Sequence, residues 1–239
     1  MRRWISSLAA PACAAVLVLS ATAAGKPGRG DLVWQAPDFA SYDVRSIALL
    51  PAFTFDNNLD ARRQTELVAA QSLRGTGYRW VSPLVAREFL SREGGDSLLD
   101  AVGHAVLKTG RPDSLDAPRL SRLVRARSIL TIRVDRFERL ELPYDQSGKP
   151  ATTVQLTAAL VDSTGRLLWS ASGQEVAEGP YQDAGTNALG MNASGLDNRP
   201  MTNQGGAPGY AETLNRLFTR WLTLFPARAA ATTPAASQN

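Results

Sequence analysis

The spacing of hydrophobic and polar positions changes near the middle of the chain. Before residue 128, short continuous apolar runs alternate with segments in which apolar residues recur every three or four positions. Over residues 128–142, most apolar residues fall on every second position. The first pattern is typical of buried strands between amphipathic helices, and the second is typical of a strand with one buried and one solvated face.

The first half of the chain predicts two short strands, each followed by helical sequence. Residues 46–53, "SIALLPAF", form an apolar run that ends in proline and Asn/Asp signals, as in a strand buried on both faces. Asn57 or Asn58 can cap a helix over about residues 59–74. A second short strand follows at residues 78–82, "YRWVS".

Three further helices are predicted before the spacing changes. The pair Ser82-Pro83 is typical of an N-cap followed by the first helical position. We expect this helix to end at Gly94-Gly95 and a second helix to begin at Asp96. A third, shorter helix is expected within residues 116–127.

The second half predicts three antiparallel strands and a closing helix. In the first strand, alternate positions are apolar and are expected to face the core: Leu130, Ile132, Val134, Leu140 and Leu142. Two apolar segments follow and are joined by "DSTG", in which Asp and Gly are a hairpin signal. The closing helix, within residues 209–226, carries an apolar stripe that includes Trp221 and is stopped by Pro226.

These elements predict an α+β fold, a two-layer sandwich in which a mixed sheet of about five strands has helices packed on one face. The chain is expected to comprise a signal peptide (1–24), a Gly/Pro-rich leader (25–40), a single domain (41–226) with a flexible loop at 179–209, and a disordered low-complexity tail (227–239).

The amino terminus has the three parts of a secretory signal peptide. A cationic "MRRW" precedes the apolar "AAVLVL" and the small residues "ATAAG", which predicts cleavage after Ala23 or Ala24, with a retained anchor as the alternative. Cys13 lies before the most apolar stretch, so it is not placed as a lipoprotein cysteine, and its removal leaves no thiol. We expect a periplasmic protein without a membrane span in the mature chain, with outer-membrane association through a partner as a further possibility.

The charge pattern argues against a nucleic-acid partner. The chain has 26 basic and 22 acidic side chains, and two of the basic ones lie in the predicted signal. The remaining basic residues are interspersed with acidic ones, as in "RVDRFERLE". Such a mixture is typical of a solvated face rather than of a surface that follows phosphates.

Several stretches resemble a group of bacterial envelope proteins. They are "SIALLPAFTFDNN", "GYRWVSPLVAREFL", "LVDSTGRLLWSASGQE" and "YAETLNRLFTRWLTLFP". The group includes the amino-terminal domain of the Tol translocation protein B (TolB), the curli secretion-channel lipoprotein and small accessory lipoproteins. The resemblance covers about residues 45–175 and 209–226, and it implies the fold and an accessory role, because the group shares no catalytic residues. The chain departs from the group in having no lipobox, and in having "RARS" at 125–128 instead of Gly-Ala-Asp.

The residues that could carry chemistry are few. His104 is the single histidine, and its helical, apolar surroundings favour a helix-surface or core-edge position over a general base. The sequence contains neither a Gly-x-Ser-x-Gly elbow nor a phosphate-binding loop. We therefore expect no cofactor, no metal site and no enzymatic activity.

The expected role is that of a non-enzymatic periplasmic accessory protein that binds another envelope protein, with a soluble carrier or sensor of a small envelope ligand as the alternative. The candidate partner-binding residues are Trp34, Tyr181, Met191 and Met201. Trp34, in the leader, either packs back onto the domain or docks on a partner. The loop 179–209 is either disordered or orders on contact with a partner.

Overall fold

The structure is a computed structural model that describes residues 30–143, 146–182, 206–226 and 228. Its strands are β1 (Leu32–Gln35), β2 (Ser46–Leu49), β3 (Phe53–Thr54), β4 (Arg79–Val81), β5 (Ser128–Leu140), β6 (Ala151–Asp162) and β7 (Leu167–Glu178). Its helices are α1 (Leu59–Leu73), α2 (Pro83–Thr109), α3 (Ala117–Leu123) and α4 (Tyr210–Leu222), with two short 3-10 helices, η1 (Phe39–Ser41) and η2 (Arg74–Thr76).

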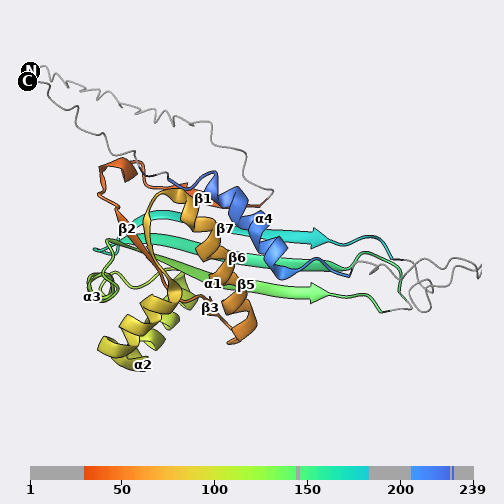
Figure 1. The fold of residues 1–239 in the computed structure, drawn as a ribbon, viewed down its shortest axis with the longest axis horizontal. Coiled ribbons are helices and arrows are strands. Elements are labelled where there is room, and N and C mark those ends of the chain that lie inside the picture. Colours follow the sequence, from red (N-terminus) through yellow and green to blue (C-terminus); the bar gives the residue numbers. More distant parts are fainter. Residues whose placement is uncertain (1–29, 144–145, 183–205, 227, 229–239) are drawn as a thin grey trace, which may run out of the picture.

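One mixed sheet holds the seven strands of the described residues (Figure 1). The order is β1-β7-β6-β5-β2-β4, and β3 pairs with β5 beside this path. Strands β5, β6, β7 and β1 are antiparallel neighbours, whereas β2 and β3 run parallel to β5, and β4 runs parallel to β2. The predicted mixed α+β sheet with helices packed against it is confirmed. It has two more strands than expected, because the leader supplies β1 and the run 46–53 divides into β2 and β3 around Pro51.

Helices lie on both faces of the sheet, whereas the sequence predicted them on one. Ile47 and Leu49 belong to the hydrophobic cluster that includes α1 and α4, and Ala48 and Leu50 belong to a second cluster with α2 and α3. Successive residues of a strand point to opposite faces, so the two clusters lie on opposite sides of β2. We call these sides the α4 face and the α2 face. The apolar run 46–50 has both of its faces covered, as the sequence indicated for that strand.

The predicted helix starts at Asn58 and Ser82 are confirmed, but the predicted helix end at Gly94-Gly95 and the predicted start at Asp96 are wrong. The side chain of Asn58 accepts a hydrogen bond from the N–H of Ala61 at 3.0 Å, and Ser82 accepts one from the N–H of Val85 at 3.4 Å. Helix α2 continues through Gly94-Gly95 to Thr109. Its buried residues Leu90, Leu98, Val102 and Val106 belong to one cluster, so packing on both sides of the glycines outweighs their low helix propensity.

A β-bulge in β5 reverses the predicted parity of its second half. The pairing of β5 with β6 shifts between Val134 and Arg136, which leaves one extra residue in β5. Beyond the bulge, the ring of Phe137 stacks on Tyr210 of α4, with centroids 3.8 Å apart. Leu140, which was expected to be buried, is 58% exposed. A one-residue insertion turns every later side chain to the other face.

Helix α4 closes the α4 face with the predicted stripe. Leu214, Leu217, Phe218 and Trp221 are buried, and the ring of Trp221 lies edge-on to that of Trp169 in β7. The end of the domain is fixed by Tyr78, whose hydroxyl donates a hydrogen bond to the carbonyl of Pro226 at 2.8 Å. Burial raises the pKa of Tyr78 to about 12.

The leader takes part in the domain, because residues 32–35 form the edge strand β1. The predicted signal peptide and nearly all of the predicted tail lie outside the described residues. Within the described part of the chain, no helix is both long enough and apolar enough to span a membrane.

Candidate functional site

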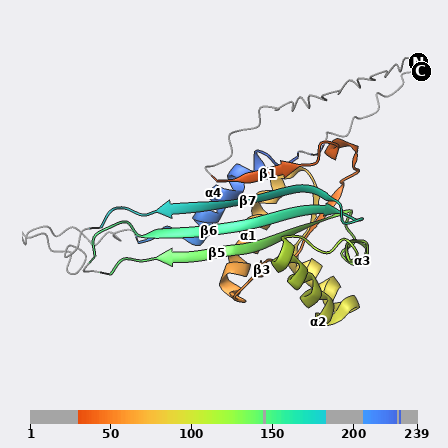
Figure 2. The same cartoon turned by 180° about the vertical axis from the view of Figure 1, so that it is seen from behind.

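Helices cover only part of the α2 face of the sheet. Helices α2 and α3 pack against β2, β3, β5 and part of β6, and no described helix packs on this face of β7 or β1. Figure 2 shows these strands from behind, with α2 beside them rather than over them. The sheet therefore offers an open surface that begins where α2 ends.

A trough of about 930 Å³ lies on this open surface. Strand β1 forms one wall and the carboxyl end of α2 forms the other. The floor is made by β6 and β7. The lining includes Leu32, Trp34, Thr109, Gly110, Arg111, Thr157, Ala159, Ser170 and Ser172. We call the concave surface that these residues line the trough.

Short side chains keep the floor of the trough low. Ser170 pairs with Ala159 across the ladder of β6 and β7, and Ser172 pairs with Thr157. Cross-strand partners share a face of the sheet, so these four residues form one continuous patch. Large charged residues usually cover a solvated sheet face, but here small residues leave room between two raised walls.

The β1 wall is apolar and exposed. Leu32 pairs with Ser172 and Trp34 pairs with Ser170, which places both side chains on the α2 face. Leu32 is 76% exposed and Trp34 is 46% exposed. Of the two alternatives for Trp34, the structure shows a residue held in the sheet whose ring still faces solvent. Whether it contacts a partner remains a prediction.

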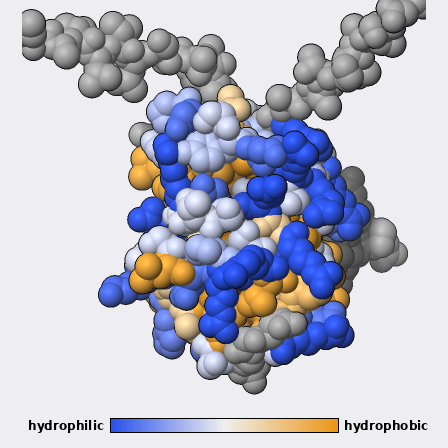
Figure 3. All heavy atoms as spheres, turned by 90° about the vertical axis from the view of Figure 1, so that its left-hand side faces the viewer, coloured by the Kyte–Doolittle hydropathy of each residue, from blue (hydrophilic) through white to orange (hydrophobic). Residues whose placement is uncertain are grey.

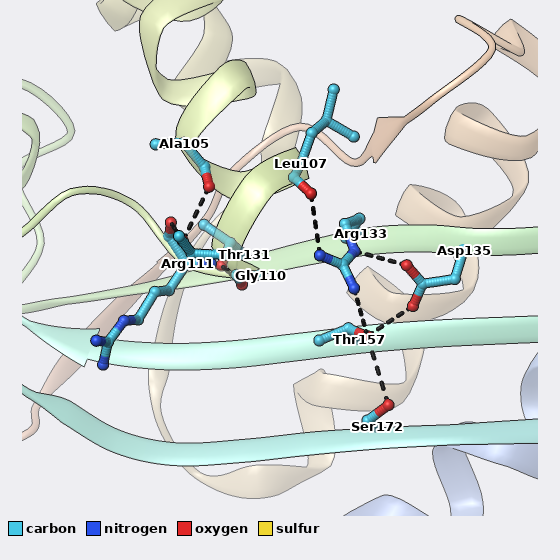
Figure 4. Close-up of polar contacts among 10 residues, drawn as sticks. Ala105, Leu107, Gly110, Arg111, Thr131, Arg133, Asp135, Thr157 and Ser172 are labelled. Atoms are coloured by element: carbon cyan, nitrogen blue, oxygen red, sulfur yellow. Dashed lines mark hydrogen bonds and ion pairs between the residues drawn. The ribbon is translucent and has the colours of Figure 1, made fainter.

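The α2 wall is held close to the sheet by a tight turn (Figure 4). Gly110 has a φ of 79°, and a Cβ at this position would lie 3.1 Å from the Cγ2 of Thr157. The hydroxyl of Thr131 lies 3.2 Å from the carbonyl oxygen of Gly110, to which it donates a hydrogen bond. Thr131 belongs to the parity of β5 that was predicted to be solvated, but the end of α2 buries it.

A network of polar contacts lies beside this wall (Figure 4). The guanidinium of Arg133 donates to the carbonyl of Leu107 in the last turn of α2 at 3.0 Å, and its Nε donates to Asp135 Oδ1 at 2.6 Å. The hydroxyl of Thr157 donates to Asp135 Oδ2 at 2.6 Å. Both oxygens of the Asp135 carboxylate are hydrogen-bonded, and the network joins α2, β5 and β6. The positive guanidinium of Arg133 and the negative carboxylate of Asp135 offset each other.

Arg111 projects from the turn that follows α2. Its carbonyl accepts a hydrogen bond from the hydroxyl of Thr109 at 2.9 Å, which fixes the backbone from which the side chain extends. Figure 4 shows the guanidinium reaching across the strands, away from Asp135. Arg111 is exposed, and within the described part of the chain it forms no ion pair.

Other exposed apolar side chains are arranged differently. Figure 3 faces the end of the molecule where α3 lies, and there hydrophilic residues divide the hydrophobic patches. Leu115, just before α3, is 87% exposed. Isolated apolar residues of this kind are common on protein surfaces. The trough differs because its two apolar side chains lie on one wall of a concave surface.

The trough contains one of the four predicted partner-binding residues, Trp34. Tyr181 is 61% exposed but follows the end of β7 at Glu178, at the opposite end of that strand from Ser170. Met191 and Met201 lie outside the described residues. His104 is exposed on α2, as the sequence indicated. Among the described residues, no group of three or more His, Cys, Asp or Glu could hold a metal ion.

Sequence reasoning missed Leu32 and Arg111 as members of the site. The alternation of "LVWQ" could have signalled a strand with Leu32 and Trp34 on one face. Nothing in the sequence around Arg111 points to the site, because its position depends on where α2 ends against the sheet. The chemistry that results is an apolar wall, a hydroxyl-bearing floor and one guanidinium, which suits non-covalent recognition.

Comparison with known proteins places the chain among structures of partly similar shape. No protein-family model and no curated protein matches the sequence. The lipoprotein GNA1162 from Neisseria meningitidis is 22% identical, with coverage of 59% of this chain and 88% of that one and a TM-score of 0.45. The PelC dodecamer from Paraburkholderia phytofirmans is 18% identical, with coverage of 83% and 99% and a TM-score of 0.44. The C-terminal domain of LpoB from Salmonella enterica is 18% identical, with coverage of 54% and 81% and a TM-score of 0.34. Similarities of this extent establish neither a family nor a function.

Proposed function

We propose that this chain is a non-enzymatic accessory protein of the bacterial cell envelope that binds another envelope protein through the trough. One observation carries the proposal. Leu32 and Trp34 stand exposed side by side on the wall of a concave, helix-free part of the sheet. Exposed apolar groups that gather on one concave surface are typical of a binding site, because burying them on contact stabilises the complex.

The composition of the trough supports a protein as the partner. Tryptophan and arginine are enriched among the residues that dominate binding energy at protein interfaces, and the trough holds Trp34 and Arg111 at its two walls. The small hydroxyl residues between them can hydrogen-bond to a partner's main chain. Because Trp34 lies in a strand of the sheet, its backbone is ordered before binding, which lowers the entropy cost of association.

The compartment is part of the proposal. The signal-like residues 1–24 support export to the periplasm with removal of the signal, and association with the outer membrane would then occur through the partner. The resemblance of the sequence to TolB-type and curli-type envelope domains supports an envelope role. The interspersed charges support a protein partner rather than a nucleic acid.

A carrier or sensor of a small ligand is the alternative, and the shape of the described part gives it less support. A carrier is expected to enclose its ligand in a largely apolar pocket. One cavity within the described core, between Trp169, Phe218 and Trp221, has a volume of only about 10 Å³. Two larger hollows beside Tyr78, of about 910 and 290 Å³, are each lined in part by exposed residues and do not enclose a ligand. The trough has room, but it is an open surface of the sheet.

Complementation of a deletion strain tests the proposal. The double variant Leu32→Glu/Trp34→Glu places two charges on the trough wall, and we expect it to lose the envelope phenotype of the wild-type protein while remaining folded and exported. The matched control is Leu59→Glu/Leu67→Glu, which changes two exposed leucines of α1. Full rescue by the trough variant would exclude the trough as the functional surface, and equal loss in the control would show that the effect of the charges is not specific to the trough.

A further inference from the structure

Of the two charged residues that line the trough, Asp31 and Arg111, only Arg111 forms no ion pair with another described residue. Asp31 also lines the trough, but its carboxylate forms an ion pair with Arg220 of α4. Arg133 lies beside the α2 wall, and its guanidinium is paired with Asp135. The guanidinium of Arg111 has no such partner among the described residues. A ligand on the α2 face of the trough therefore meets the guanidinium of Arg111, which can pair with a carboxylate of the ligand.

The apolar and the cationic parts of the trough lie at a defined separation. Trp34, Ser170, Ala159 and Thr131 are successive cross-strand partners on β1, β7, β6 and β5. Neighbouring strands are spaced by about 4.8 Å, so Trp34 and Thr131 lie about 14 Å apart. The carbonyl of Gly110 is bonded to Thr131, which places the backbone of Arg111 near that end.

We propose that the trough binds an extended segment of the partner protein that carries a carboxylate for Arg111 and an apolar or aromatic side chain for Trp34. This inference rests on the proposed function and specifies its ligand. An extended chain advances about 3.3 Å per residue, so the two side chains lie no more than about four residues apart in the segment. The side chain of Arg111 points back across the strands, which permits a shorter separation (Figure 4).

The floor suits the main chain of such a segment. Ser170 and Ser172 present hydroxyls on this face, whereas the hydroxyl of Thr157, 3.5 Å from that of Ser172, already donates its proton to Asp135. Hydroxyls both donate and accept hydrogen bonds, so they can satisfy the N–H and C=O groups of an extended peptide whatever its sequence. Specificity then comes from the two ends, where Arg111 selects a carboxylate and Trp34 selects an apolar side chain.

Selection from a library of random short peptides displayed on phage tests this inference with the full-length purified protein as bait. We expect the enriched peptides to carry Asp or Glu within four residues of an aromatic or large aliphatic residue. Binding of a selected synthetic peptide should fall about fivefold or more with Arg111→Glu, because an attractive pair becomes repulsive. Replacing the acidic residue of the peptide by lysine should restore binding to Arg111→Glu and weaken binding to the wild type. Arg63→Glu, an equal charge change at an exposed position on α1, should leave binding unchanged.

The other outcomes separate the inference from the function on which it rests. Peptides that lose binding with Trp34→Ala but show no acidic preference and ignore Arg111→Glu would overturn the inference and leave the trough as a binding surface. Failure to enrich any peptide that depends on Trp34 or Arg111 would overturn the inference and count against the trough itself. A dimer of the protein that Trp34→Ala dissociates would show that a second copy occupies the trough, and would also overturn the inference.

Discussion

The Oδ2 of Asp31 lies 2.9 Å from the Nε of Arg220, although the two residues are 189 positions apart in the sequence. Glu175 of β7 contacts the same guanidinium. Asp31 directly precedes β1, so this ion pair fastens the start of the edge strand to α4 on the α4 face. Gly173 makes the contact possible, because a Cβ there would collide with Asp31 Oδ1. The wall of the trough is thus held from the opposite side of the sheet.

Replacement of Arg220 tests this fastening. The side chain of Asp31 is 1% exposed, and Arg220→Met leaves its carboxylate without the guanidinium. Breaking a buried pair in this way costs about 3–5 kcal/mol of the free energy of unfolding. Arg216→Met is the matched control, since Arg216 pairs with Glu212 on the exposed side of α4, and such a pair contributes less than about 1 kcal/mol. Urea unfolding measures the loss of stability in each variant. Equally small losses in Arg220→Met and Arg216→Met would show that Arg220 does not hold β1.

Trp221 is expected to be a major source of stability for the domain. It is 1% exposed and packs with Trp169 and Phe218. Trp221→Ala removes a large buried ring, and we expect a loss of about 3–5 kcal/mol in the free energy of unfolding. Leu67→Ala, at a 58% exposed position of α1, should change it by no more than about 0.5 kcal/mol. An unchanged urea midpoint for Trp221→Ala would mean that α4 is peripheral.

The buried hydroxyl of Tyr78 predicts a loss of stability at alkaline pH. Its pKa is about 12 in the folded protein, against an ordinary value of 10.0. Below pH 10 both the folded and the unfolded states keep the proton, so the contribution of Tyr78 is fully present. Above pH 10 the unfolded state loses the proton first, and the free energy of unfolding falls by about 3 kcal/mol as the pH rises to 12.

Tyr78→Phe separates this effect from the rest of the alkaline titration. The variant loses the hydrogen bond to Pro226, which costs about 1 kcal/mol near neutral pH. Between pH 10 and 12 its stability should decline less than that of the wild type, so the two curves of unfolding free energy against pH should cross, with the variant the more stable protein near pH 12. Parallel curves would show that Tyr78 titrates normally.

His104 distinguishes an accessory protein from an enzyme that uses a histidine base. It is the single histidine of the chain and is exposed on α2. Loss of a general base lowers a rate by about a hundredfold or more. We expect His104→Gln to rescue a deletion strain fully at matched expression. A null phenotype from a stable, exported His104→Gln protein would contradict the proposal of a non-enzymatic role.

Local patterns in the sequence predicted most of the elements, and long-range contacts account for the differences. Asn58 and Ser82 act within four residues of themselves, so their capping roles could be read directly. The continuation of α2 through Gly94-Gly95 could not be predicted in this way, because it depends on a hydrophobic cluster that α2 shares with distant strands. The bulge after Val134 was equally hidden, since the alternation of residues shows parity but not an inserted residue.

In the candidate site, too, local sequence patterns pointed to some features, and long-range contacts determine the others. Trp34 was suspected because an aromatic residue stood out in a Gly/Pro-rich leader, but its strand depends on pairing with β7, far along the chain. Arg111 enters the trough only because α2 ends over Thr131. Residues that meet through tertiary contacts leave no shared local pattern.

Site-specific photo-crosslinking in cells of the native host shows directly whether a partner touches the trough. A photoreactive amino acid is placed at Trp34 or Ser172 in the trough and at Leu67 on α1 as the control. If a partner occupies the trough, a discrete crosslinked species with another envelope protein forms from positions 34 and 172, and none forms from position 67. Crosslinks from position 67 without any from positions 34 and 172 would show that the partner binds elsewhere.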